Sequence, residues 1–280
     1  MGSDTTMIQS ILRPPFLFLV RRGLLPSFLS YRLYPHIRPQ YVVVADSKLY
    51  LGDCNWLTLW ANGVYEAWTT DVVKSELKQG DVFVDVGANI GYFTIMGSKL
   101  VGERGQVYAF EPNPFSFEIL RRNVETNNLH NVTIEQKAVT NFSGRVELWA
   151  NKGNTYAWKE GSRIPFSADC VRLDDYFQGQ HIDLMKMDID GGETTALEGT
   201  FEMSSNDIEK LIIEFWPIGF RKQGINPETF ASMLANRGFS SYTSSFRDSF
   251  RQTELNKFLA TYAALEHSYY DSLNLFCVKD

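Results

Sequence analysis

The fold is decided by residues 80–91, which read Gly-Asp-Val-Phe-Val-Asp-Val-Gly-Ala-Asn-Ile-Gly. Val82–Val86 is a short apolar run between two glycine-containing segments, as expected of a strand that is buried on both faces. Beyond it, apolar or small residues recur at spacings of three and four until Gly102, namely Ile90, Phe93, Gly97 and Leu100. The stretch therefore predicts a strand, a glycine turn and a helix.

The same alternation continues toward the end of the chain. Further strands are predicted over residues 106–110, 132–139, 144–150, 182–187, 211–215, 239–243 and 273–278. A helix capped by Asn113 begins at Pro114, and others are predicted over residues 193–202, 227–236 and 254–266. The glycine- and aromatic-rich span 151–168 is interpreted as a loop or cap over a site. Repeated βα units predict an α/β fold with a doubly wound, mostly parallel sheet.

In such sheets, ligands bind beyond the carboxyl ends of the strands. The first loop there has Gly87 and Gly91 in a GxxxG spacing. A dinucleotide fold needs GxGxxG, because its middle glycine admits the pyrophosphate, and here that position is Ala88 or Asn89. At the end of the next strand, Glu111 is placed to accept both hydroxyls of a ribose. The combination favours a nucleoside without a diphosphate.

S-adenosylmethionine is a ligand of this kind, because its adenosine is joined to methionine through a positively charged sulfur. The sulfonium and the ammonium favour an acidic site, and Asp85, Glu111 and Asp188 all fall at predicted strand ends. We therefore predict S-adenosylmethionine as the cofactor, and no metal.

Four segments resemble the motifs of the FkbM family of S-adenosylmethionine-dependent methyltransferases. They are GDVFVDVGANIGYFT at 80–94, AFEPNP at 109–114, NVT at 131–133 and KMDIDGGE at 186–193, with GVYE at 63–66 similar to the family's lead-in. The match runs from about residue 49 to about residue 245. The resemblance implies a class I, Rossmann-like methyltransferase fold. It usually implies methyl transfer to a hydroxyl oxygen of a sugar, polyketide or other metabolite.

The resemblance also implies the cofactor site. It places the methionine end of the cofactor among Asp85, Gly87, Asn89 and Gly91. It places the ribose at Glu111 and the adenine at Lys137-Ala138, where a backbone N–H would bond the base edge. Glu66 is interpreted either as a lid over the methionine ammonium or as part of a surface salt bridge.

An aliphatic alcohol is a poor nucleophile, so methyl transfer to oxygen benefits from a general base. Asp188, just beyond the fourth predicted strand, is the first choice for this base and is also counted among the cofactor-binding residues. Its rivals are Asp190, Glu193 and Glu214. The family's usual Asp-Val-Glu-Gly-Ala-Glu is here Asp-Ile-Asp-Gly-Gly-Glu, so Asp190 has a shorter arm. Glu193 has a second interpretation as a helix cap, and Asp190 as a turn residue.

Other side chains have two interpretations each. Five aromatics either line a glycan or acyl pocket or pack in the core: Trp149, Tyr156, Trp158, Phe166 and Trp216. His181 precedes its strand rather than following it, so we expect it at the opposite edge of the sheet from the site.

Residues 1–48 are interpreted as a basic, apolar, helical extension and residues 49–280 as the methyltransferase domain. Residues 1–45 hold five arginines and one aspartate, a net charge of +4, which leaves −10 for the rest of the chain. We expect either helices that dock on the domain with their arginine heads in solvent, or a peripheral contact of residues 7–40 with an anionic membrane.

The composition of the chain argues against several other classes of protein. A net charge of −6 argues against a nucleic-acid partner, and three cysteines without a CxxC pair support neither a disulfide framework nor a zinc site. No apolar run matches a membrane span or a signal peptide, so a cytoplasmic or membrane-peripheral location and a small-molecule or glycan substrate are expected. A nicotinamide-dependent oxidoreductase, an RNA methyltransferase and a non-catalytic binding protein of the same fold stay open as alternatives.

Overall fold

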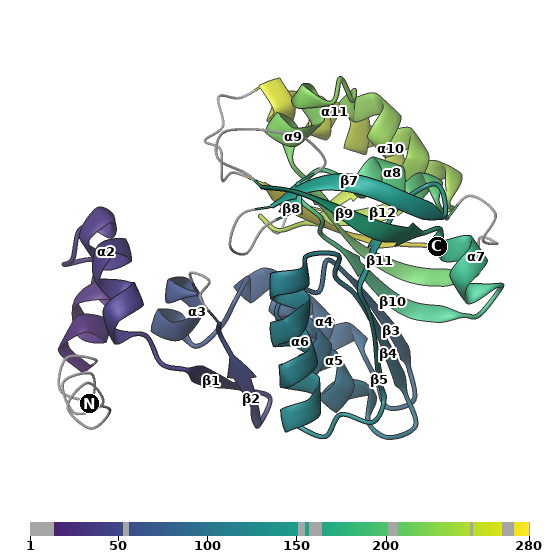
Figure 1. Ribbon diagram of the computed structural model, residues 1–280. Coiled ribbons are helices and arrows are strands. Elements are labelled where there is room, and N and C mark those ends of the chain that lie inside the picture. The colour runs from purple at the N-terminus through teal and green to yellow at the C-terminus, as the bar shows by residue number, and fades with distance from the viewer. Residues whose placement is uncertain are drawn as a thin grey trace.

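The computed structural model describes residues 14–52, 56–150, 155–156, 164–200, 207–246, 249–264 and 272–279. The strands of the large sheet are β3 (Val82–Val86), β4 (Gln106–Phe110), β5 (Val132–Glu135), β10 (Ile182–Met187), β11 (Ile208–Phe215), β12 (Ser241–Ser244), β13 (Ser249–Arg251) and β14 (Leu273–Val278). Their order is β13-β12-β14-β11-β10-β3-β4-β5 (Figure 1). The five strands from β11 to β5 run parallel, whereas β14, β12 and β13 pair antiparallel at one edge. The mostly parallel α/β sheet is therefore confirmed.

Helices cover both faces of this sheet, because successive residues of a buried strand point to opposite faces. They are α4 (Ala67–Glu76), α5 (Tyr92–Val101), α6 (Pro114–Thr126), α7 (Leu173–Phe177), α8 (Glu193–Glu198), α9 (Pro217–Lys222), α10 (Pro227–Asn236) and α11 (Gln252–Ala264). Phe83 of β3 packs in the core on the side of α5 and α6, and its neighbour Val84 packs in the core on the side of α8, α10 and α11. The fold is thus doubly wound, as predicted.

A smaller sheet lies beside the large one and corrects two predictions. Its strands are β6 (Lys137–Val139), β7 (Gly144–Ala150), β8 (Thr155–Tyr156) and β9 (Ile164–Val171), in the order β6-β9-β7-β8. The single strand predicted over 132–139 is wrong: β5 is the edge strand of the large sheet, and residues 137–139 pair in parallel with β9 instead. The loop predicted over 151–168 is wrong for 155–156 and for 164–168, which both pair with β7. Residues 151–154 and 157–163 lie outside the described part of the chain.

Most other predicted bounds are confirmed. Strands 106–110, 144–150, 182–187 and 273–278 and helix 227–236 have the bounds expected of them. Asn113 caps α6 by accepting a hydrogen bond from the N–H of Phe115 at 3.0 Å, with Pro114 in the first turn. The helix predicted over 193–202 ends at Glu198, and the C-cap that follows is Gly199, where a Cβ would lie 2.1 Å from the carbonyl oxygen of Thr140.

The N-terminal part is helical, as predicted, and also contains a hairpin that was not predicted. A helical stretch over 14–21 is followed by α2 (Ser27–Ile37), by the hairpin β1 (Tyr41–Val44) and β2 (Ser47–Tyr50), and by α3 (Leu57–Asn62). The N–H of Tyr50 donates to Asn123 Oδ1 of α6 at 2.7 Å, which fixes the hairpin to the domain. Among the described helices, none has the length and hydropathy that a bilayer crossing requires.

Candidate active site

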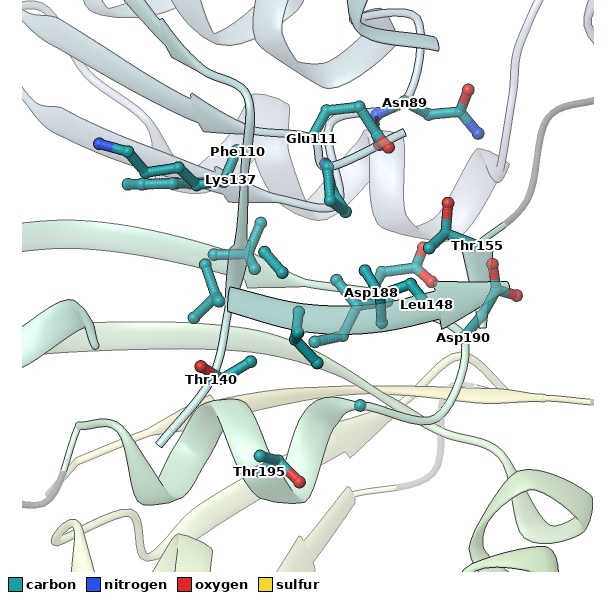
Figure 2. Close-up of a pocket in the computed structure, with 18 of the residues that line it drawn as sticks. Asn89, Phe110, Glu111, Lys137, Thr140, Leu148, Thr155, Asp188, Asp190 and Thr195 are labelled. Carbon is teal, nitrogen blue, oxygen red and sulfur yellow. Dashed lines mark hydrogen bonds between the residues drawn. The ribbon is translucent and has the colours of Figure 1, made fainter. Parts of the chain in front are cut away.

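A cavity of about 240 Å³ opens where the carboxyl ends of β3, β4 and β10 face the small sheet. Figure 2 shows Asn89 and Glu111 on one side of it and Asp188, Asp190 and Thr155 across from them. Seven residues predicted for cofactor binding or catalysis line this cavity: Gly87, Asn89, Glu111, Lys137, Ala138, Asp188 and Asp190. The other four, Asp85, Gly91, Glu66 and Glu214, are not among the lining residues.

The glycine turn after β3 needs its glycine because β10 comes very close. Gly87 has φ +82°, and a Cβ built on it would lie 1.9 Å from the carbonyl oxygen of Asp188. The next turn residue, Asn89, also has a positive φ, a conformation that asparagine tolerates better than most residues. The turn therefore exposes backbone directly at the cavity, and it holds the ends of β3 and β10 together.

We expect Gly87→Ala to destabilise the fold by about 3 kcal/mol, from positive-φ strain and overpacking together. Gly179→Ala is the matched control, because Gly179 has φ +85° and an added Cβ would meet no atom within 4 Å. Thermal denaturation of both variants separates the two costs. Equal losses of stability would show that the close contact with Asp188 is unimportant.

Glu111 is buried and held by two backbone donors. Its Oε2 accepts from the N–H of Asn89 at 2.8 Å and its Oε1 from the N–H of Asn113 at 2.8 Å. Each carboxylate oxygen keeps a lone pair for one further donor. Burial raises the pKa of Glu111 to about 7, despite these two hydrogen bonds. The site thus presents a fixed, two-pronged acceptor at the end of β4.

Lys137 and Ala138 reach the cavity from β6 rather than from the end of a long third strand. The Lys137 ammonium pairs with Glu135 Oε2 at 2.8 Å and lies 5.9 Å from the centre of the Tyr176 ring. Ala138 is buried at the wall. The side chain of Lys137 is therefore engaged with Glu135 and Tyr176.

Lys186 forms an ion pair with Asp188, and no role was predicted for it from the sequence. Only 3% of its side chain is exposed, and its Nζ lies 3.0 Å from Asp188 Oδ2 and 5.0 Å from the centre of the Phe93 ring. Burial alone lowers the pKa of Lys186, but the carboxylates of Asp188, Asp85 and Glu66 outweigh it and raise that pKa above its ordinary value. A buried ammonium thus neutralises the carboxylate that faces the cavity.

A fully buried glutamate, Glu193, and a partly buried one, Glu214, lie near this ion pair. Glu193 Oε1 accepts from the backbone N–H groups of Ile189 and Gly191, so it holds the loop that carries Asp188 and Asp190. Burial raises the pKa of Glu193 to about 7. Burial, followed by the charges of Asp188 and Glu193, raises the pKa of Glu214 well above its ordinary value. Within the described residues, Oε2 of each glutamate is buried without a hydrogen-bond partner.

The remaining predicted residues support the site from behind. Asp85 is fully buried and its Oδ2 accepts from Thr94 Oγ1 at 2.6 Å, and Gly91 is the left-handed N-cap of α5. Glu66 Oε2 accepts from Asn274 Nδ2 at 3.3 Å, so its partner there is an amide of β14 rather than a surface cation. Burial and the charge of Asp188 raise the pKa of Glu66 to about 7.

Of the two interpretations of the aromatics, the pocket lining does not hold for Trp149, Phe166 and Trp216, because Phe110 and Phe142 are the aromatics of the described wall. Trp216 is buried in the core after β11, and Trp149 and Phe166 lie on the small sheet outside the lining. Trp158 and the side chain of Tyr156 lie outside the described structure.

His181 lies before β10, at the opposite edge of the sheet, as expected. Its Nε2 lies 3.4 Å from Asp183 Oδ1 and 3.6 Å from Glu209 Oε2 on the surface.

Comparison with known proteins identifies the family. The model of the "Methyltransferase FkbM domain" matches residues 85–241, which is more than half of the chain. Methyltransferase sdnD of Sordaria araneosa is 27% identical over 202 residues, covering 59% of this chain and 76% of the relative. Among solved structures, the SAM-dependent O-methyltransferase of Thermotoga maritima is 14% identical with a TM-score of 0.44, covering 77% of this chain and 66% of the other.

Fibrillarin of Aeropyrum pernix, solved with natively bound S-adenosyl-L-methionine, is 10% identical with a TM-score of 0.41, covering 76% of this chain and 74% of the other. The sequence match is the decisive one, because it contains the glycine turn, Glu111 and the loop that begins at Asp188. This chain belongs to the FkbM methyltransferase domain family, and its cofactor is S-adenosylmethionine.

Proposed function

We propose that this methyltransferase transfers its methyl group to a hydroxyl oxygen of a small molecule, such as a saccharide, polyketide or related metabolite. The observation that carries the proposal is the placement of Asp188. Its side chain lines the cavity and is 22% exposed, and the Lys186 ammonium lies 3.0 Å from its Oδ2. An ionised carboxylate that faces an apolar cavity is suited to accept the proton of a hydroxyl group.

The residues of the cavity fit S-adenosylmethionine. We propose that Glu111 accepts the two ribose hydroxyls, that the backbone of Lys137-Ala138 borders the adenine, and that Gly87 and Asn89 border the methionine end. Glu66, Glu193 and Glu214 lie behind the lining residues, where their carboxyl groups favour a ligand that carries a sulfonium and an ammonium group beside its own carboxylate. Asp85 and Gly91 then act by holding the turn in place.

When bound, S-adenosylmethionine supplies a methyl group on a positively charged sulfur, and the carbon–sulfur bond breaks with its electron pair left on a neutral thioether. The chain's own residues hold the acceptor and exclude water. Asp188 accepts the hydroxyl proton as the acceptor oxygen forms its new bond to carbon. Lys186 pairs with the Asp188 carboxylate and orients it, and Glu193 fixes the loop on which Asp188 lies. Asp190 and Glu214 are the alternative bases, since both lie within electrostatic reach of this group.

The acceptor is tested by a screen of free and lipid-linked saccharides, polyketides, amines and RNA with a methyl-labelled donor. We expect label in an O-methyl ether of a small molecule, identified by mass spectrometry of the product. Label in an N-methyl amine or in RNA would contradict the proposal. The chain carries −10 outside residues 1–45, which gives RNA little electrostatic attraction.

The division of the chain stays a proposal as well. We propose that residues 1–48 extend the methyltransferase domain of residues 49–280. Hydrogen bonds from the hairpin to α6, such as that of the Lys48 N–H to Asn127 Oδ1 at 2.8 Å, join the two parts.

We expect cofactor binding to release protons near pH 7. Glu66, Glu111 and Glu193 have pKa values of about 7 in the cofactor-free protein, and a bound cation favours their ionised forms. Titration calorimetry in buffers of different ionisation enthalpy should therefore give different binding heats at pH 7. Heats that do not depend on the buffer would contradict this expectation.

The same groups make the folded protein less stable as the pH rises. Their folded pKa lies above the ordinary value of 4.5, so the folded state binds more protons than the unfolded state between these values. The free energy of unfolding of the cofactor-free protein should consequently fall between pH 4.5 and about 7.

A further inference from the structure

The N-terminal helices form an arm beside the methyltransferase domain. We define the arm as residues 14–37, and Figure 1 shows it in purple, standing apart from the two sheets and close to α3. Phe16, Tyr34 and Ile37 are buried and pack with Leu57 of α3. Because these side chains already fix the arm to the rest of the chain, its other apolar side chains are not needed for that contact.

Several large apolar side chains of the arm face solvent. Phe18 is 56% exposed, Leu24 63% and Leu33 39%. The guanidinium of Arg22 lies 5.7 Å from the centre of the Phe18 ring, so a cation and an exposed ring share one surface. Exposed apolar side chains next to arginines are typical of segments that lie in the interface of a membrane.

A hollow between the arm and α3 also combines apolar side chains with arginines. A cavity of about 480 Å³ is lined by Pro14, Leu17, Phe18, Arg21, Arg22 and Trp60. Among the described residues, the lining offers apolar contacts and two guanidinium groups and no carboxylate. Arginine recognises phosphate oxygens in two-pronged geometry, so this lining suits a phosphate group attached to an apolar chain.

The charge of the segment agrees with this chemistry. Residues 14–45 contain Arg21, Arg22, Arg32 and Arg38 and no aspartate or glutamate. Arg21 donates through Nε to the carbonyl of Ala61 and is thereby positioned at the hollow. The rest of the chain is acidic, so an anionic membrane would attract the arm and repel the domain.

We propose that the arm docks the enzyme on a bilayer that contains anionic phospholipids, with Phe18 and Leu24 entering the interface and Arg22 contacting lipid phosphate. The proposal concerns location and is independent of the chemistry at Asp188. A second copy of this acidic chain is the competing occupant, and the test is arranged to distinguish it.

The test is co-sedimentation of the full chain with vesicles of phosphatidylcholine alone or of phosphatidylcholine and phosphatidylglycerol at 3:1. We expect binding to the anionic vesicles that is weakened by salt, because each charge near such a surface contributes about fivefold in partitioning. Arg22→Glu should weaken binding about 25-fold by that measure, and the double variant Phe18→Ser, Leu24→Ser should abolish it. Phe115→Ser is the matched control, since Phe115 is 68% exposed on α6.

Circular dichroism and binding of S-adenosylhomocysteine verify that each variant is folded. Equal binding to both kinds of vesicle, or unchanged binding of the folded Arg22→Glu variant, would overturn the proposal. Failure to bind vesicles, with a dimer in sedimentation velocity that the Phe18→Ser, Leu24→Ser variant loses, would assign the arm to a second copy instead. None of these outcomes depends on which acceptor the enzyme methylates.

Discussion

Asp188→Asn should lower kcat about 100- to 10,000-fold, which is the usual contribution of a positioned general base. Asparagine keeps the shape of the side chain but does not take up the hydroxyl proton. The binding of S-adenosylhomocysteine should change much less than kcat, because Glu111 and the glycine turn are left intact. Steady-state methyl transfer and calorimetry on the same preparation measure the two effects separately.

The rival carboxylates supply the controls for this variant. Asp190 has φ +52°, a conformation that asparagine also adopts, so Asp190→Asn leaves the backbone of the loop unstrained. Glu214→Gln removes the titratable group at the end of β11 in the same manner. We expect both variants to retain more activity than Asp188→Asn. If either of them is the inactive one, the base is assigned to the wrong residue.

Lys186→Met should lower kcat at least tenfold, measured as steady-state methyl transfer. Without the ammonium, the Asp188 carboxylate loses the partner that lies 3.0 Å from its Oδ2 and holds it at the cavity. A hydrogen bond to a charged group is worth about 1.5–3 kcal/mol, which corresponds to a loss of this size. Breaking a buried ion pair costs about 3–5 kcal/mol, so a lower free energy of unfolding is expected as well.

Two further lysine variants keep this test decisive. Lys210→Met removes a lysine of the neighbouring strand that pairs with Glu76 and Glu209, and it should leave kcat unchanged. Lys186→Arg keeps the charge and should keep most of kcat, even where stability falls. An unchanged kcat in folded Lys186→Met would show that Asp188 works without this lysine.

The sequence was informative wherever one local signal decided an element. The apolar run of β3 and the Asn113-Pro114 cap are signals of this kind, and both elements form as predicted. The prediction of one strand over 132–139 was wrong because residues 132–135 pair with β4 in the large sheet, whereas residues 137–139 pair with β9 in the small sheet. The break at residue 136 depends on these partner strands, which the local sequence does not show. The alternation of Ile164, Phe166 and Ala168 was a usable strand signal that the loop interpretation overlooked.

In the site too, positions at strand ends could be predicted from the sequence, whereas properties that depend on burial could not. Five predicted residues, Gly87, Asn89, Glu111, Asp188 and Asp190, meet at one cavity because the ends of parallel strands share one edge of the sheet, whereas Lys137 and Ala138 reach it from the small sheet. The role of Lys186 was missed, although a lysine in the apolar run Leu184-Met185-Lys186-Met187 is itself a signal of a buried partner. The raised pKa values of Glu66, Glu193 and Glu214 depend on burial, which spacing along the chain does not reveal.

Calorimetric titration with S-adenosylhomocysteine and with NAD, on the wild type, Glu111→Ala and Glu118→Ala, tests whether the cavity binds S-adenosylmethionine through Glu111. The wild type should bind S-adenosylhomocysteine at one site and give no heat with NAD. Glu111→Ala should weaken binding at least tenfold, because each lost hydrogen bond to a charged group is worth about 1.5–3 kcal/mol. Glu118→Ala, at an exposed residue of α6 paired with Arg121, should bind like the wild type. Binding of NAD instead would contradict the assignment of S-adenosylmethionine as the cofactor. Full affinity for S-adenosylhomocysteine in Glu111→Ala would contradict the role of Glu111 in binding it.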